Sequence, residues 1–256
     1  MTTTIEKFNQ FKALHQPGNP IILYNIWDAG SAQLIEGAGA RAIATGSHPL
    51  AHAQGYQDGE NIPFNQLLIT VEQIVASVTV PVSIDFESGY AGQDLALLSE
   101  NLTRLLQLGV VGVNFEDQNM RAGGMYDIDI QVERISTLRR VSSDLDLPLF
   151  INARTDLFLR EKDKTRHSGL MDAACARASA YQQAGANSFF TPGLDNLDLI
   201  TTLCEQAELP LNIVKMPTAP DNQTLARAGV GRISYGPFAY RSLMDIFKER
   251  AREILH

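Results

Sequence analysis

Short apolar runs alternate with helical patterns along the whole chain, and polar or glycine residues separate them. Such a run is typical of a buried strand, whereas apolar residues at every third or fourth position predict an amphipathic helix. The helical spacing is clearest over 94–108, where leucines recur before Gly109, and a shorter helix over 29–37 is expected to bury Leu34 and Ile35. The expected strands are 20–26, 41–45, 80–86, 110–115, 149–153, 188–190, 211–214 and 233–234, and the remaining expected helices are 129–141, 171–184, 197–206, 223–228 and 237–255.

Eight strands that alternate with helices predict a parallel sheet with right-handed crossovers. The 256 residues give about 32 per strand–helix unit, which is the size of a closed (β/α)8 barrel of the TIM type. A doubly wound open sheet is the alternative, but no G-x-G-x-x-G follows the first strand and no Walker-type loop occurs. No linker-like or low-complexity stretch divides the chain. We therefore expect an α/β fold with one domain over 1–256.

The composition narrows the class of protein. Hydrophobic residues make up 45% of the chain, which excludes a disordered chain, and the net charge of -8 argues against a nucleic-acid partner. No apolar run approaches the roughly 18 residues of a membrane span, and the N-terminus lacks the apolar core of a signal peptide. The two cysteines, Cys175 and Cys204, form no CxxC pair and suit a reducing compartment. We expect a cytoplasmic protein without membrane contact.

Carboxylate and arginine side chains follow three consecutive expected strands. Asp85 and Glu87 come at the end of the third expected strand, Glu116 follows the fourth, and Arg154 follows the fifth. In a barrel these ends meet at one rim, which is where catalytic residues lie. Carboxylates gathered there repel one another, so they need a cation between them. Carboxylate and water ligands favour hard ions, so the sequence predicts Mg²⁺ or Mn²⁺.

Other interpretations of single residues stay open. An acidic residue after a strand can instead cap the next helix, which is the role expected for Asp94 and Asp129. Trp27 follows the first strand and would either stack on a ligand or pack in the core. His48 and Asn212 also stand near strand ends, so both are candidates for substrate contacts.

Five motifs in the same order along the chain carry a resemblance to a known family. Further matches follow at residues 192–193, 210–212 and 234–237. Together they cover nearly the whole sequence and resemble the isocitrate lyase/phosphoenolpyruvate mutase superfamily. The five motifs are NIWDAGSA at 25–32, GYQDGE at 55–60, DFESGY at 85–90, GVNFEDQ at 112–118 and INARTD at 151–156.

The resemblance implies a role for each matching residue. Asp85 is similar to the carboxylate that binds Mg²⁺ directly, and three other carboxylates are similar to those that hold the waters of the metal. Gly46 and Ser47 match the turn that grips a substrate carboxylate, and Arg154 resembles the arginine that contacts the 2-oxo or enolate oxygen. The expected site residues are Arg154, Asp58 and Glu116 for catalysis, Trp27, Gly46, Ser47, His48, Arg154 and Asn212 for the substrate, and Asp85, Glu87, Glu116 and Asp58 for the metal.

One segment departs from the pattern of the resembling lyases. Those lyases carry a cysteine and a histidine in the loop after the fourth strand, and the mutases carry a lysine and an asparagine there. The corresponding residues 118–126 (QNMRAGGMY) contain neither cysteine nor histidine, and Arg121 and Asn119 are only loose analogues of the mutase pair. Gly123 and Gly124 suit either a mobile lid or an ordinary flexible loop.

The resemblance and the strand-end chemistry lead to one main hypothesis. We expect a Mg²⁺-dependent lyase acting on a small anionic 2-oxo dicarboxylic acid, with oxaloacetate decarboxylation or a related C–C cleavage as its representative. The alternatives are P–C bond chemistry on phosphonopyruvate or a carboxyphosphonate, and a non-catalytic protein that binds 2-oxo acids. The resemblance further implies a homo-oligomer, a dimer or a tetramer, in which the last helix (237–255) is exchanged between subunits.

Overall fold

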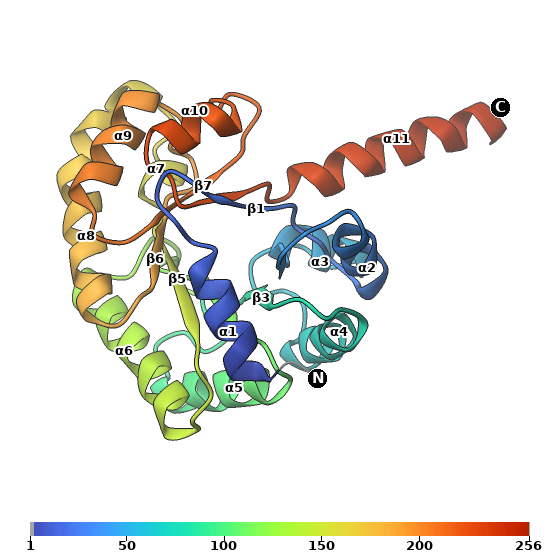
Figure 1. Cartoon of the computed structure of the whole chain (residues 1–256), viewed down its shortest axis with the longest axis horizontal. Coiled ribbons are helices and arrows are strands. Elements are labelled where there is room, and N and C mark those ends of the chain that lie inside the picture. Colours follow the sequence, from blue (N-terminus) through green and yellow to red (C-terminus); the bar gives the residue numbers. More distant parts are fainter. Residues whose placement is uncertain (1–2, 256) are drawn as a thin grey trace.

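The computed structural model describes residues 3–255 and has the predicted barrel architecture (Figure 1). Eight parallel strands form one sheet in the order β1-β8-β7-β6-β5-β4-β3-β2, and a parallel bridge between Ile26 and Thr45 brings its two edges together. Helices lie between successive strands, as a right-handed βα repeat requires. The strands are β1 (Ile21–Leu23), β2 (Ile43–Ala44), β3 (Val82–Asp85), β4 (Gly112–Glu116), β5 (Phe150–Arg154), β6 (Ser188–Phe190), β7 (Leu211–Val214) and β8 (Arg232–Ser234).

All seven predicted helices occur, and the sequence pattern missed several others. The 14-residue helix α4 is the largest omission. Its β-branched residues weaken helix propensity, but Leu67, Val71 and Ile74 share one buried face, so tertiary packing decides the structure. The helices are α1 (Thr4–Ala13), α2 (Ala29–Gly37), α3 (Ser47–Ala53), α4 (Phe64–Ser77), α5 (Leu95–Gln107), α6 (Ile128–Asp144), α7 (Leu157–Arg160), the 3₁₀ helix η1 (Lys164–Leu170), α8 (Met171–Gln183), α9 (Leu197–Gln206), α10 (Asn222–Arg227) and α11 (Phe238–Leu255).

Two local expectations were wrong and one cap was confirmed. Asp94 caps α5 by accepting hydrogen bonds from the backbone N–H groups of the first turn. Asp129 instead lies inside the first turn of α6, where Asp127 occupies the N-cap position. Leu34 is 75% exposed, because α2 presents Ala32 and Ile35, rather than Leu34, to the core.

The N-terminal ends of the strands are closed by an aromatic plug. Helix α1 lies across this end, and the ring of Phe11 packs against His15 and Phe150 with ring centres 4.7 and 5.2 Å apart. A side chain at Gly112 would meet the Phe11 ring, so glycine at this strand start makes room for the plug. The plug leaves the opposite, C-terminal ends of the strands as the open face of the barrel.

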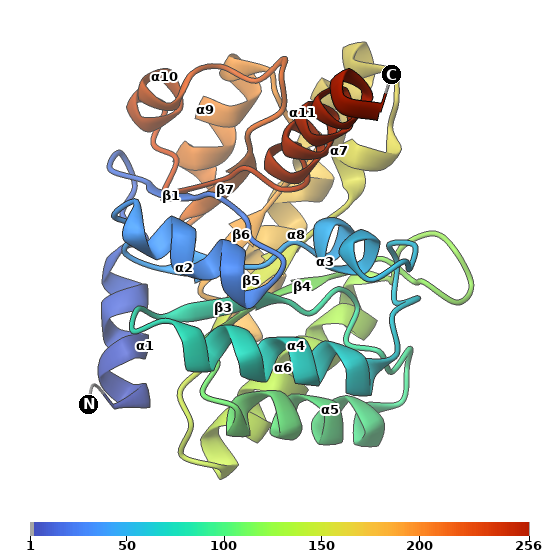
Figure 2. The ribbon, with the colours of Figure 1, turned by 90° about the vertical axis from the view of Figure 1, so that its right-hand side faces the viewer.

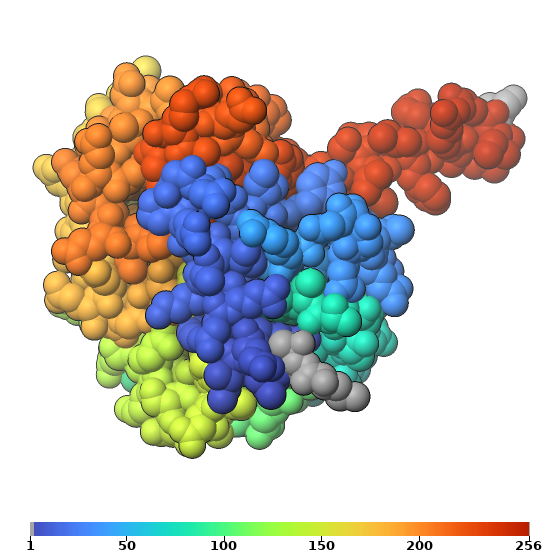
Figure 3. Space-filling view, in the orientation of Figure 1, coloured from blue at the N-terminus to red at the C-terminus, as the bar shows by residue number. Residues whose placement is uncertain are grey.

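The last helix leaves the barrel. Figure 1 shows α11 extending away from the other elements, and the space-filling view in Figure 3 shows it standing clear of the molecular body. Every residue over 241–250 is exposed as a result. Within residues 3–255, no helix is long and apolar enough to cross a membrane.

Candidate active site

Two adjoining cavities open at the C-terminal ends of the strands. The larger has a volume of about 290 Å³ and the smaller about 180 Å³. Ser47, Asp58 and Arg154 line both, so the cavities meet along these three side chains. Their position at the C-terminal rim is the place where barrel enzymes carry their chemistry.

The strand order brings the predicted charged residues together at this rim. Asp85, Glu116 and Arg154 are the last residues of β3, β4 and β5, which are neighbours in the sheet. Asp85 lines the larger cavity, whereas Glu87 and Glu116 line the smaller one. Asp58 reaches both cavities from the exposed segment between α3 and α4.

Arg154 is locked between two carboxylates. Its Nη1 lies 2.7 Å from Oε2 of Glu116, and its Nε and Nη2 donate to the two oxygens of Asp156 at 2.7 and 3.1 Å. Burial alone would lower the pKa of the guanidinium, but the charges of Glu116 and Asp156 outweigh it and raise that pKa. Arg154 is therefore a fixed positive charge shared by both cavities.

The two carboxylate oxygens of Asp85 differ in their hydrogen bonding. Its Oδ2 accepts a hydrogen bond from the backbone N–H of Ser47 at 3.1 Å, whereas its Oδ1 is buried without a hydrogen-bond partner among the described residues. Burial raises the pKa of this carboxyl, although Arg154 and the Ser47 hydrogen bond oppose the shift. A buried carboxylate oxygen without a partner is costly, so this atom is suited to bind a cation.

Glu87 sits in a strained turn. Its φ is +48°, a left-handed value that is unfavourable for a residue with a side chain. Its carboxylate accepts hydrogen bonds from the backbone N–H of Glu60 at 2.7 Å and from the hydroxyl of Tyr90 at 2.8 Å. At Gly89, a Cβ atom would lie 2.4 Å from the Leu98 side chain, so only glycine fits. Burial, together with the charges of nearby carboxylates, raises the pKa of Glu87 to about 8.

These residues fit a magnesium ion held through one carboxylate and water. In residues 3–255, no three His, Cys, Asp or Glu side chains converge closely enough to hold a metal by themselves. Mg²⁺ keeps several waters and needs only one or two carboxylates from the protein. The unpartnered Oδ1 of Asp85, with Asp58, Glu87 and Glu116 around the same cavities, provides that donor set. A cation would also offset the repulsion between carboxylates that, in addition to burial, raises the pKa values of Glu87 and Glu116.

Two backbone N–H groups at the start of α3 already form hydrogen bonds within the protein. The backbone N–H of Gly46 donates to the carbonyl of Ile26 at 3.2 Å, and that of Ser47 donates to Asp85. Both residues line the larger cavity, as does His48. The backbone groups expected to grip a substrate are therefore already bonded within the protein.

Two predicted substrate residues lie elsewhere. Trp27 is half-buried beside α11, with its ring centre 5.0 Å from that of Tyr240, and it does not line either cavity. Asn212 is the second residue of β7 rather than its end, so it lies in the barrel interior, where it accepts a hydrogen bond from Ser234 at 3.2 Å. Both remain predictions without a place in the cavity.

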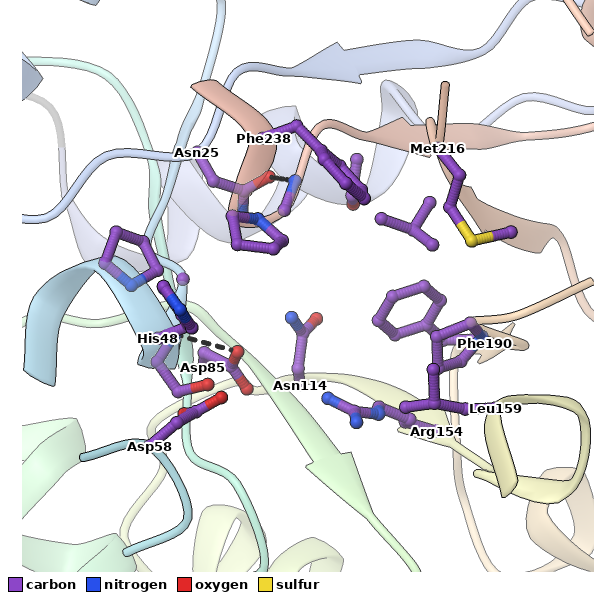
Figure 4. Close-up of a pocket in the computed structure, with 18 of the residues that line it drawn as sticks. Asn25, His48, Asp58, Asp85, Asn114, Arg154, Leu159, Phe190, Met216 and Phe238 are labelled. Atoms are coloured by element: carbon purple, nitrogen blue, oxygen red, sulfur yellow. Dashed lines mark hydrogen bonds between the residues drawn. The ribbon is translucent and has the colours of Figure 1, made fainter. Parts of the chain in front are cut away.

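Sequence reasoning missed the apolar wall and a second arginine. Figure 4 shows His48, Asp58 and Asp85 on one side of the cavity, and Leu159, Phe190 and Met216 on the other. Arg241, from the first turn of α11, also lines the cavity. These residues come from α7, the end of β6, the segment after β7 and the start of α11, and no short motif in the sequence marks them.

The loop over 118–126 borders the smaller cavity through Gln118 and Met120. It folds back on itself, with a bridge between Gln118 and Met125, and projects beside the barrel in Figure 2. Asn119 accepts a hydrogen bond from the backbone of Ala122, and Arg121 lies beside Gly92, so neither side chain lines the cavities. The loose analogues of the mutase pair are thus directed away from the site.

Comparisons with known proteins support the barrel fold. The family described as phosphoenolpyruvate phosphomutase matches residues 11–255. A candidate phosphonomutase from Burkholderia cenocepacia, whose structure is solved, is 37% identical with a TM-score of 0.93, covering 98% of this chain and 99% of that one. The 2-methylisocitrate lyase of Escherichia coli is 25% identical over 253 residues, 90% of this chain and 82% of that protein. The fold is shared with a phosphonopyruvate hydrolase solved with oxalate and Mg²⁺, at a TM-score of 0.83 and 20% identity over 97% of this chain and 86% of that one.

Proposed function

The chain belongs to the phosphoenolpyruvate phosphomutase family, within the superfamily that the sequence motifs indicated, and we propose that it is a Mg²⁺-dependent lyase acting on a small 2-oxo dicarboxylic acid. Decarboxylation of oxaloacetate is the representative reaction. The observation that carries the proposal is the shared rim of the two cavities, where Arg154 lies opposite a buried Asp85 oxygen without a partner. A phosphonopyruvate hydrolase of the same fold binds oxalate and Mg²⁺, which supports the choice of metal and ligand class.

The chemistry of such a cleavage needs positive charge at one oxygen. When the C3–C4 bond of oxaloacetate breaks and CO₂ leaves, the electron pair stays with the pyruvate fragment and negative charge develops on the carbonyl oxygen. Arg154 has about five N–H donors, of which Glu116 and Asp156 engage only part, so donors remain for that oxygen. Bound Mg²⁺, held by Asp85 and the carboxylates around it, would supply further positive charge to the site.

The surrounding residues prepare this site before the substrate arrives. Glu116 and Asp156 fix the plane of the Arg154 guanidinium, so it need not reorient during the reaction. Arg241 at the larger cavity is placed to bind the second carboxylate of a dicarboxylic acid. Phe190 and Leu159 exclude water on the opposite side, which strengthens the charge interactions.

A second candidate reaction is P–C bond chemistry on phosphonopyruvate. The 37% identity to a candidate phosphonomutase favours it, and the same charged rim would stabilise the same enolate. Neither Asn119 nor Arg121 lines a cavity, so a mutase reaction lacks the loop residues that it would need in this arrangement.

One assay separates these functions. The protein is incubated with Mg²⁺ and either oxaloacetate, phosphonopyruvate, methylisocitrate or isocitrate, and pyruvate, glyoxylate and phosphate are measured separately. Pyruvate from oxaloacetate, abolished by excess chelator, is the expected result. Phosphate from phosphonopyruvate would favour the second candidate, and tight binding without turnover of any compound would indicate a non-catalytic binding protein.

The exposed helix α11 supports a homo-oligomer. Its apolar residues recur at helical spacing, and Phe247 is 71% exposed. In a barrel the last helix normally covers the outer face of the last and first strands, but here Ile22 on that face of β1 and Tyr24, just after the strand, are exposed. We propose that α11 covers this face on a second copy of the chain, so that the protein is a dimer or a tetramer.

Light scattering tests this assembly. We expect wild-type protein to be larger than a monomer, and Phe247→Arg to weaken association at least about tenfold, because it places a charge in an apolar interface. Glu249→Arg changes a residue on the opposite side of the same helix and is expected to leave the assembly intact. A monomeric wild-type protein, or equal behaviour of the two variants, would contradict the proposal.

A further inference from the structure

Arg134 places a positive charge in the interior, apart from the cavities. It lies in α6, its side chain is fully buried, and within residues 3–255 it forms no ion pair. A buried guanidinium without a carboxylate needs hydrogen-bond acceptors and aromatic faces in place of water. The groups that supply them therefore indicate what this residue holds in place.

Its contacts come from three other segments as well as its own helix. Nη2 donates to the backbone carbonyl of Ser88 and, at 3.0 Å, to the Ser88 hydroxyl, and Nη1 donates to Gln131 one turn earlier. The guanidinium carbon lies 4.2 Å from the ring centre of Tyr126 and 4.7 Å from that of Phe115. One planar group thus joins α6 to the turn after β3, to β4 and to the loop that follows β4.

Two of these contacts adjoin carboxylates of the smaller cavity. Ser88 directly follows Glu87, and Phe115 directly precedes Glu116. Glu87 has the left-handed φ of +48°, which persists only when the surroundings fix the turn. The two hydrogen bonds to Ser88 fix the residue that directly follows Glu87 in this turn.

The third contact reaches the loop over 118–126. Tyr126 is the last residue of this loop, is buried, and has its backbone N–H bonded to the carbonyl of Asp117 at 2.7 Å, so both ends of the loop meet there. Gln118 and Met120 of the loop line the same smaller cavity as Glu87. The loop base and the Glu87 turn are therefore held against one guanidinium.

We propose that Arg134 is a positioning residue. It holds the Glu87 turn and the base of the 118–126 loop in a fixed position relative to each other, so that both border the smaller cavity. The inference rests on the proposed function in one respect, because the cation is what the Glu87 turn would help to hold. Its chemistry requires the planar fork of arginine: lysine keeps the charge but cannot bridge the same groups.

The same helix provides a matched control. Arg139 is a half-buried arginine of the same helix. It donates to the backbone carbonyls of Leu149, at 2.8 Å, and Gly185, and to the Asn187 side chain at 2.8 Å. These partners lie before β5 and β6, at the N-terminal ends of the strands. Arg139→Lys therefore removes a comparable set of guanidinium hydrogen bonds far from the cavities.

Titration calorimetry with Mg²⁺ compares the two variants. We expect Arg134→Lys to raise the dissociation constant for Mg²⁺ about 10–100-fold, as is usual for residues that orient metal-holding groups, and Arg139→Lys to change it less than about threefold. Ser88→Ala, which removes one hydrogen-bond acceptor and spares the core, is expected to raise it by a smaller factor, about three- to fivefold.

Hydrogen exchange followed by mass spectrometry gives a second measurement that does not depend on the metal. In Arg134→Lys, peptides covering 87–90 and 118–126 are expected to exchange faster than in wild type, whereas Arg139→Lys accelerates peptides around 185–187 instead. Equal exchange of 87–90 and 118–126 in the two variants would overturn the inference, as would unchanged Mg²⁺ affinity in Arg134→Lys. Wild-type protein that binds no Mg²⁺ would refute the proposed function alone, because the exchange result still decides the role of Arg134.

Discussion

The two ends of the barrel bury ionisable groups in opposite ways. At the N-terminal end, His15 lies between the rings of Phe11 and Phe150 and its Nδ1 is bonded to the carbonyl of Phe11 at 2.8 Å. Burial, reinforced by a nearby arginine, lowers its pKa to about 3, so the ring is neutral and the plug is apolar. At the C-terminal end, burial and like charges raise the pKa of Glu87 to about 8, and Asp85 keeps an oxygen without a partner.

This difference separates a stability end from a functional end. The plug packs three rings together and keeps its ionisable ring neutral, whereas the open rim concentrates like charges that would be more stable apart. Changes at the rim should therefore affect binding and turnover more than folding, and changes at the plug should do the reverse.

The largest expected effect is on turnover at the rim. Asp85→Asn keeps the shape of the side chain but removes the charge that would hold the cation. We expect Mg²⁺-dependent pyruvate release from oxaloacetate to fall by about 10³-fold or more. Unfolding by urea should show no loss of stability, because an amide is cheaper to bury than a carboxylate. A variant with full activity, or one that is unfolded, would contradict the contrast.

At the plug, Phe11→Ala should have a large effect on stability and little on turnover. Phe11 is fully buried, and its removal leaves a cavity between α1 and the strand starts. The free energy of unfolding is expected to fall by about 3–5 kcal/mol. At a temperature where the variant is folded, its kcat should stay within about threefold of wild type. A kcat loss comparable to that of Asp85→Asn would show that the two ends are coupled.

The pH dependence of stability distinguishes the ends more finely. His15 has a pKa of about 3 in the folded protein and near 6.5 when unfolded, so between these values the unfolded chain binds the extra proton. The contribution of the neutral His15 to the free energy of unfolding is therefore complete above pH 6.5. As the pH falls from 6.5 toward 3, the free energy of unfolding decreases by about 1.4 kcal/mol per pH unit. His15→Phe should therefore lose less stability than wild type between pH 7 and 5, measured by urea unfolding. Parallel curves for the two proteins would refute this account of the plug.

The smallest predicted effect concerns the outer part of the rim. Arg241 lines the larger cavity from α11 and does not line the smaller one. Arg241→Gln should raise KM for oxaloacetate about tenfold with kcat changed less than threefold, because it removes an interaction with a carboxylate that does not react. Steady-state kinetics test this, and a loss confined to kcat would place Arg241 at the reacting centre instead.

The barrel and the carboxylate rim could be predicted because both depend on local patterns. Eight apolar runs set the strands, and the residues that follow β3, β4 and β5 include Glu87 besides the charged strand ends. Parallel pairing then brings these ends to one edge without further information. Asp58 was different: it lies in a segment without a strand, and only the resemblance to the superfamily pointed to it.

What the sequence could not predict depends on tertiary contacts. Asn212 lies before the end of β7, so its side chain does not reach the cavity. A shift of one or two residues along a strand decides whether a side chain reaches the rim. Trp27 packs against Tyr240 because α11 starts beside it. Arg241 reaches the cavity for the same reason. No periodicity in the chain reveals where the last helix leaves the barrel.

The most direct test of the central claim is calorimetric titration with oxalate, a planar dianion that resembles the enolate of pyruvate. The account predicts that wild-type protein binds oxalate in the presence of Mg²⁺, and that chelation of the metal or Asp85→Asn weakens this binding at least about 100-fold. Oxalate affinity that is the same with and without Mg²⁺, in wild type and in Asp85→Asn alike, would contradict a magnesium site at this rim.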